Sequence, residues 1–137
     1  MLNGTPSKQG LIKATFTIGS IFAFGQGAAI DYARAMAAYK VGAEGGDARC
    51  QYQVGMMYYQ GLGVAVDYKQ TRAWVEKAAA QDYPKAVATL GAMYGNGTDV
   101  TPSWRRAREL YQRAIELGDS MSVKNMQDLT EVIPRVS

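Results

Sequence analysis

The sequence offers few of the side chains with which proteins usually perform chemistry. It has 137 residues, no histidine and one cysteine, Cys50. Without histidine there is no imidazole metal ligand or general base, and one thiol can build neither a thiolate metal site nor an internal disulfide. We therefore expect no cofactor, no metal and no enzymatic activity. The single cysteine favours an intracellular, reducing compartment, either the cytoplasm or an organelle interior.

The segment "WRRARELYQR" at 104–113 is the main candidate for contact with nucleic acid. On a helix, one side would carry apolar residues: Trp104, Ala107, Leu110, Tyr111 and Ala114. The arginines spread over the other side: Arg105, Arg106, Arg108 and Arg113. Glu109 lies four residues from both Arg105 and Arg113, so we expect it to pair with each. A solvated outer face is the favoured interpretation. A basic surface that contacts phosphates in a ribonucleoprotein or other nucleic-acid assembly is the alternative.

Two further residue types have a chemical and a structural interpretation. Cys50 could be a reactive thiol, but it aligns with Ala14, Ala86 and Ser122 in the repeat described below, which favours a small packed residue. The aromatic residues could stack on bases, but most recur at equivalent positions, so we expect them in the core: Tyr52, Tyr58, Trp74, Tyr94, Trp104 and Tyr111.

The bulk composition suits one domain or one short array. Apolar residues make up 47% and charged residues 20% of the chain, and the net charge of +3 is mild. The apolar run "FTIGSIFAF" near the N-terminus is too short to cross a membrane as a helix. The repeat assigns this run to the fold rather than to a targeting segment.

A shift of 36 residues superposes the chain on itself without a gap. Gly19 aligns with Gly55 and Gly91, and Gly25 aligns with Gly61 and Gly97. Each unit is predicted to be two helices, which we name helix A and helix B. Helix A is expected at about 11–24, 48–59 and 84–94, and helix B at about 31–44, 67–81 and 103–117.

Particular residues should hold each helix pair in place. The first loop glycine suits a helix C-terminus with positive φ, and Asp31, Asp67 and Ser103 suit the N-cap of helix B. A glycine inside helix A should allow the neighbouring helix to approach closely. The full set of expected structural residues is Gly19, Gly25, Gly27, Asp31, Gly55, Tyr58, Gly61, Gly63, Asp67, Gly91, Tyr94, Gly97 and Ser103.

The period divides the chain as a short solenoid with ends. The predicted segments are an N-terminal tail (1–10), three repeats (11–46, 47–82 and 83–118), a capping helix (119–133) and a C-terminal tail (134–137). The first repeat is degenerate, and the cap is more polar than the repeats, as a terminal element should be. The predicted fold class is all-α, a right-handed α-solenoid of three 36-residue helix-turn-helix repeats plus a C-terminal capping helix.

The segments "LGAMYGNG" and "VGMMYYQGLGVAVDYKQTRAWVEKAAAQ" closely resemble the Sel-like repeat (SLR), a tetratricopeptide-related helical solenoid. Gly61, Gly63 and Asp67 match that family's glycine-x-glycine loop and following aspartate. The third repeat has Asp99 in place of the second loop glycine, which departs from the pattern. The resemblance covers roughly 11–133.

The resemblance implies a non-catalytic scaffold or adaptor that binds a protein partner on the concave surface of its A helices and helps to assemble a larger complex. Subtracting the expected core positions from each helix A leaves nine candidate partner-binding residues: Thr17, Ser20, Phe24, Gln53, Met56, Gln60, Thr89, Ala92 and Asn96. Met56 and Phe24 are apolar where water is expected, which suits a binding surface.

Overall fold

The fold was analysed in a computed structural model, which describes residues 7–132 of the chain. Its described part contains seven helices and follows the predicted order of helix pairs. The bounds are α1 (Lys8–Phe24), α2 (Tyr32–Glu44), α3 (Ala48–Gln60), α4 (Tyr68–Ala80), α5 (Pro84–Asn96), α6 (Trp104–Glu116) and α7 (Met121–Val132). Thus α1, α3 and α5 are the A helices, and α2, α4 and α6 are the B helices.

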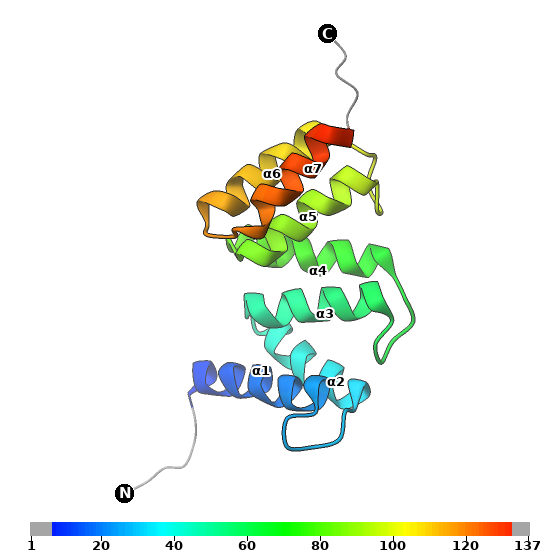
Figure 1. The fold of residues 1–137 in the computed structure, drawn as a ribbon. Helices are drawn as coiled ribbons and strands as arrows, with labels where there is room; N and C mark the ends of the chain where they lie inside the picture. The colour runs from blue at the N-terminus through cyan, green and yellow to red at the C-terminus, as the bar shows by residue number, and fades with distance from the viewer. Residues whose placement is uncertain (1–6, 133–137) are drawn as a thin grey trace, which may run out of the picture.

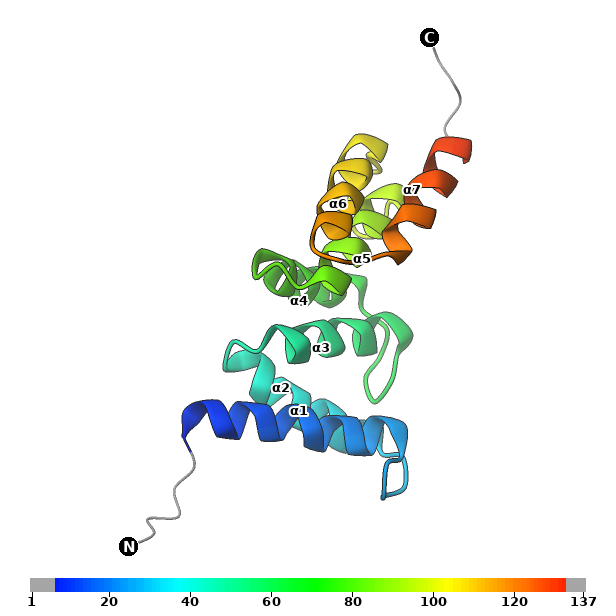
Figure 2. The same cartoon turned by 60° about the vertical axis from the view of Figure 1, so that its left-hand side comes forward.

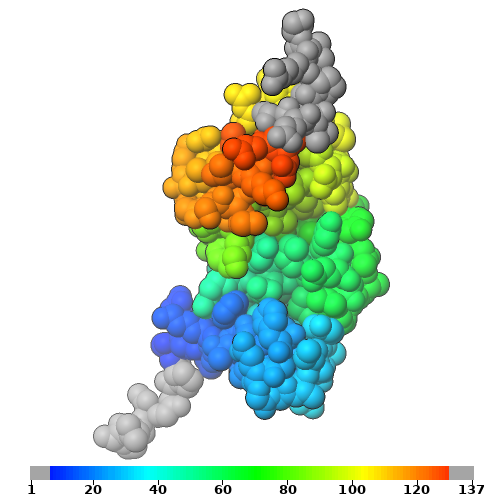
Figure 3. Space-filling view, in the orientation of Figure 1, coloured from blue at the N-terminus to red at the C-terminus, as the bar shows by residue number. Residues whose placement is uncertain are grey.

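The helix pairs stack into an elongated array (Figures 1 and 2). Each A helix packs against its own B helix, and each B helix packs against the next A helix along the chain. The helices α1 and α7 therefore form opposite ends of the stack, as the space-filling view also shows (Figure 3). This arrangement confirms the all-helical solenoid with a final helix that covers α6.

Glycine ends every A helix of a repeat. Gly25, Gly61 and Gly97 have φ values of 70°, 73° and 73°, and the backbone N–H of each bonds to a carbonyl of the last turn. Such a left-handed residue stops a helix and turns the chain back at little steric cost when it is glycine. The loop then leads into the next helix B.

The predicted N-caps of the B helices are confirmed. The carboxylate of Asp31 accepts a hydrogen bond from the Arg34 N–H, and that of Asp67 accepts from the backbone N–H groups of the next helix at 69 and 70. The hydroxyl of Ser103 accepts from the Arg106 N–H in the same way. A cap of this type satisfies a backbone donor that the helix itself leaves unpaired.

The glycines inside the A helices lie where helix B comes closest. A Cβ atom placed on Gly55 would lie 2.9 Å from Cγ2 of Val75 and 3.3 Å from the carbonyl oxygen of Thr71. At Gly19 it would lie 2.6 Å from the Tyr39 ring. Because these distances are below or near the limit of real Cβ contacts, the predicted close approach of the two helices is confirmed.

The buried residues form two clusters, one at each joint between repeats. The first joins α2 to α3 around Tyr39, Cys50 and Val54, and the second joins α4 to α5 around Val75 and Leu90. Cys50 is fully buried, as expected for a small packed residue. Each cluster therefore spans a joint between repeats rather than lying within a single repeat.

Two sequence expectations were wrong in detail. Helix α1 begins at Lys8, because the Ser7 hydroxyl caps it by accepting from the Gly10 N–H, so residues 8–10 belong to the helix and not to a tail. Trp104 was expected in the core, but its side chain is 51% exposed. It is the first residue of α6, and its side chain lines a surface hollow instead.

Two remaining points concern the ends of the chain and the length of its helices. Residues 1–6 and 133–137, which include the predicted C-terminal tail, lie outside the described residues. Within the described range, the helices are too short or too polar for any of them to span a bilayer.

Candidate functional site

The nine residues predicted to bind a partner follow the A helices along the stack, and we name them the A-helix face. Four of them are exposed: Thr17, Phe24, Gln60 and Asn96. The other five are partly buried: Ser20, Gln53, Met56, Thr89 and Ala92. None of the nine belongs to the buried core. The spacing separated surface from core positions on α3 and α5, but on α1 the expected core position Ile18 is 44% exposed. Whether they bind a partner stays a prediction.

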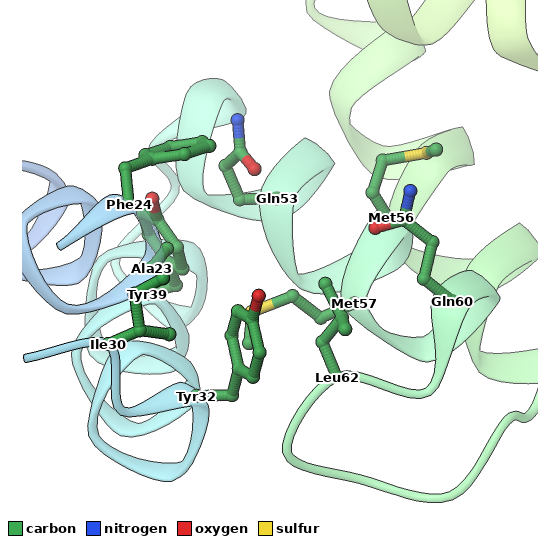
Figure 4. A pocket seen from close by; sticks show the side chains of 10 residues that line it. All are labelled: Ala23, Phe24, Ile30, Tyr32, Tyr39, Gln53, Met56, Met57, Gln60 and Leu62. Carbon is green, nitrogen blue, oxygen red and sulfur yellow. The ribbon is translucent and has the colours of Figure 1, made fainter.

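Four residues of the A-helix face line one pocket between the first two repeats. These are Phe24 at the end of α1 and Gln53, Met56 and Gln60 on α3. The pocket has a volume of about 300 Å³ and also takes residues from α2 and both loops (Figure 4). All ten lining residues are uncharged: Ala23, Phe24, Ile30, Tyr32, Tyr39, Gln53, Met56, Met57, Gln60 and Leu62.

The side chains around this pocket give it apolar walls with a few polar groups. Phe24 extends from α1 toward Gln53, while Met56 and Gln60 lie on the opposite side (Figure 4). The ring of Tyr32, at the start of α2, lies between these two sides. Such a site fits an uncharged apolar side chain, and the glutamine amides are placed to bond the polar backbone that carries it.

The remaining residues of the A-helix face do not enter this pocket. The Ser20 and Tyr39 hydroxyls are 3.0 Å apart and share a hydrogen bond, and the Thr17 hydroxyl donates to the Lys13 carbonyl at 3.3 Å. Thr89, Ala92 and Asn96 lie one repeat further along, on α5. The predicted set is therefore a strip along the stack, of which only the part between the first two repeats is hollowed into this pocket.

The sequence alone missed the loop residues of the pocket. Ile30 precedes the N-cap of α2, and Leu62 lies between the two glycines of the second loop. Their apolar side chains in glycine-rich loops were a usable signal, since exposed loops are usually polar. Ile30 is 55% exposed despite its contact with the pocket, so it also contributes to the open rim.

A second pocket lies toward the other end of α1 and α3. It has a volume of about 310 Å³ and includes Lys13, Asp47 and Arg49. The Arg49 guanidinium binds the Asp47 carboxylate at 2.9 Å and lies 4.2 Å from the centre of the Phe16 ring. Burial opposes ionisation of Asp47, but the hydrogen bonds from Arg49 outweigh it, so the pKa of this carboxyl is below its usual value. Because that acid pairs with Arg49, the pocket keeps a small positive charge at Lys13.

The basic outer face on α6 is interrupted by acidic partners. Arg106 pairs with Glu109 at 3.7 Å and lies over the Tyr94 ring, and Arg113 pairs with Asp82 from the turn between α4 and α5. The expected pairing of Glu109 with Arg105 and Arg113 was therefore wrong, because Arg113 reaches Asp82 and Glu109 turns to Arg106. Arg105 and Arg108 instead line a wide surface hollow beside Trp104. Two of the four predicted phosphate-contacting arginines thus pair with carboxylates on the surface.

The described residues supply little for catalysis. No cluster of three or more possible metal ligands occurs among them. Burial raises the pKa of the Cys50 thiol to about 11, so it is protonated and unreactive near neutral pH. The thiol lies against Gly42 of α2 and has a side-chain hydrogen bond with Thr15 of α1.

Two comparisons with known proteins give matches. The sequence pattern named Sel1 repeat matches residues 48–83 and 84–119, together more than half of the chain. A Sel1 repeat protein from Oxalobacter formigenes has 33% identity and a TM-score of 0.82, with 84% of this chain and 47% of that chain covered. No curated protein matches the sequence.

Two other solved structures have the same fold. A protective antigen present in uropathogenic Escherichia coli strains, which displays an SLR fold, has 33% identity and a TM-score of 0.83, with 89% of this chain and 26% of that chain covered. Helicobacter pylori cysteine rich protein B has 17% identity and a TM-score of 0.70, with 90% and 99% covered, which shows likeness of fold alone. The chain spans less than half the length of the Oxalobacter and Escherichia proteins. Two tandem repeat matches and the shared solenoid establish that the chain belongs to the Sel1 repeat family.

Proposed function

We propose that the protein is a non-catalytic adaptor that binds a segment of a partner protein along its A-helix face, as part of the assembly of a larger complex. The partner segment places a large apolar side chain in the pocket lined by Phe24, Met56 and Gln60. The uncharged lining of this pocket is the observation that carries the proposal.

Several features favour a peptide over a small polar ligand. The apolar groups at the rim, Phe24 and Ile30, are 62% and 55% exposed, so covering them removes apolar surface from water. Methionine at position 56 is unbranched and can adapt to different side chains. The amides of Gln53 and Gln60 each offer both a donor and an acceptor, which suits a peptide backbone.

The test uses a displayed library of random linear peptides selected on the whole chain. We expect selected peptides to share a large apolar residue and to lose binding to a double variant, Phe24→Asp with Met56→Asp. The loss should reach about a hundredfold or more, since two buried apolar contacts are replaced by charges. Circular dichroism and thermal melting should be unchanged, because neither residue is in the core.

The matched control is Val41→Asp with Val123→Asp. These valines are 61% and 44% exposed and lie on α2 and α7, away from the pocket. Selected peptides should bind this variant as they bind the original chain. Equal loss in both double variants would show that added negative charge, and not the pocket, controls binding, and the proposal would then be wrong.

A further inference from the structure

One side of α1 is an apolar stripe at the end of the solenoid, separate from the A-helix face. It consists of Leu11, Ala14, Ile18 and Ile21, and we name it the end stripe. Leu11 is 52% and Ile18 44% exposed, Ala14 is exposed and Ile21 is half-buried. The spacing of three, four and three residues places these side chains on one helix face, as in the seam of a coiled coil.

Three of the four positions are buried in the later repeats, whereas the counterparts of Leu11, Asp47 and Tyr83, are partly buried. The counterparts of Ala14, Ile18 and Ile21 are Cys50, Val54 and Met57 in the second repeat and Ala86, Leu90 and Met93 in the third. Their exposed fractions are 0%, 0% and 4% in the second repeat and 0%, 7% and 3% in the third. The end stripe therefore has the composition of a buried joint but lacks its cover.

In the later repeats this cover is the preceding helix B. A Cβ atom placed on Gly42 of α2 would lie 2.5 Å from Sγ of Cys50, which shows how tightly α2 packs on α3 there. Val75 of α4 is likewise in one cluster with Leu90 of α5. The end stripe is the place where one further joint of this kind would form, beyond the first helix of the stack.

We infer that a second copy of the chain covers the end stripe, α1 against α1, to form a two-fold symmetric dimer. In the described residues, α2, α4 and α6 are each already covered by the next helix, α3, α5 and α7. A second copy consequently has no free helix B to offer, but it does have the same stripe. A surface that meets its own copy gives a closed dimer.

The charges of α1 allow this self-pairing. The positions that flank the stripe are uncharged: Gly10, Thr15, Thr17 and Phe22. The two charged residues of α1, Lys8 and Lys13, lie about 100° or more around the helix from the centre of the stripe. Like charges are therefore not brought together, as they would be if either lysine lay at the seam. The stripe is only about 15 Å long, so the dimer is small and dissociates on dilution.

Sedimentation velocity across a range of concentrations tests the dimer directly. The mass should rise from 14.9 kDa toward twice that value as concentration increases. Ile18→Lys should weaken the association by roughly tenfold or more, since each copy loses one large apolar contact and gains a charge. Val41→Lys is the matched control, because it adds the same charge at a residue of α2 that is 61% exposed, and it should associate like the original chain.

A cysteine pair tests the geometry and does not depend on the folding of the lysine variant. In a Cys50→Ala background, Ala14→Cys should form a disulfide-linked dimer under mild oxidation, whereas Lys13→Cys should not. Alanine is the native residue at the equivalent position 86, so the background change is conservative. A monomer at every concentration, an association that Ile18→Lys leaves unchanged, or equal crosslinking at 13 and 14 would each overturn the inference. Because the peptide pocket lies on another face, these results are independent of the proposed function.

Discussion

Gly55 shows how much one missing side chain contributes to the joint between two helices. The Cβ atom of any other residue would meet Val75 and the Thr71 carbonyl of α4, and neither can move away freely. We predict that Gly55→Val lowers the free energy of unfolding by about 1–3 kcal/mol, the usual cost of overpacking a core, although valine is no worse than glycine as a helix former. Urea denaturation measures this loss.

Gly95 is the matched control, because it also lies inside an A helix but has room. A Cβ atom there would lie 3.7 Å from Leu129 and 3.8 Å from Ala107, which are ordinary contacts. Gly95→Ala should therefore raise the free energy of unfolding, by about 0.5–1 kcal/mol. The two substitutions should therefore change the free energy of unfolding in opposite directions. A stabilising Gly55→Val would show that α3 and α4 do not approach as closely as described.

Local rules explain which single residues the sequence predicted. The loop glycines and the capping residues Asp31, Asp67 and Ser103 act on backbone groups within a few positions of themselves, so sequence spacing was sufficient to find them. The partners of Arg113 were not predictable in this way. The carboxylate that pairs with Arg113 belongs to Asp82, which is 31 residues away and is brought near by the turn between α4 and α5.

At the level of loops and helices, the position of the second loop glycine keeps its left-handed backbone conformation in the repeat that lacks this glycine. Gly27 and Gly63 have φ values of 85° and 74°, and Asp99 takes the same left-handed region with φ of 56°. Aspartate tolerates this region better than most residues. The Arg72 guanidinium of α4 binds the Asp99 carboxylate at 2.7 Å, so the loop of the third repeat is bonded to helix B of the second repeat.

Two substitutions at position 99 separate the backbone effect from the ion pair. Both Asp99→Gly and Asp99→Ala remove the carboxylate, but only alanine must hold a strained φ. We predict that the glycine variant is more stable than the alanine variant by about 1 kcal/mol, as thermal or urea unfolding would show. Equal stability would mean that the loop can change its φ without cost.

Whole helices were predicted more reliably than the surfaces between them. The 3.6-residue periodicity and the repeat fixed the six repeat helices to within three residues at every end, because each helix repeats the same apolar pattern. The pocket was only partly foreseen. The periodicity of α3 predicted that Gln53, Met56 and Gln60 share one face. The paths of two loops bring Tyr32 and Leu62 to the pocket, and periodicity does not encode those paths.

For the molecule as a whole, stability depends on the covered ends of the stack. The last helix, α7, packs against α6 and also reaches α5. Deleting 119–137 should uncover an apolar face of α6, and we predict a chain that keeps its helical spectrum but melts earlier or aggregates. Circular dichroism and light scattering on heating would show this.

A shorter truncation after residue 132 is the control for this deletion. It removes only residues outside the described part of the chain, and it should leave the melting temperature unchanged. Unchanged melting after the longer deletion as well would indicate that the cap contributes nothing to the stack. The prediction rests on the general property that each repeat is stabilised by its neighbours rather than by its own core.

The position of Cys50 makes the opening of one joint measurable without an added label. Its sulfur lies between α2 and α3, where the first repeat meets the second, and the chain has no other thiol to compete for a reagent. A thiol reagent can reach it only when these two repeats separate. The rate of modification under native conditions therefore gives the free energy of that separation. Compared with the free energy of complete unfolding, it reveals whether the solenoid opens one repeat at a time or all at once.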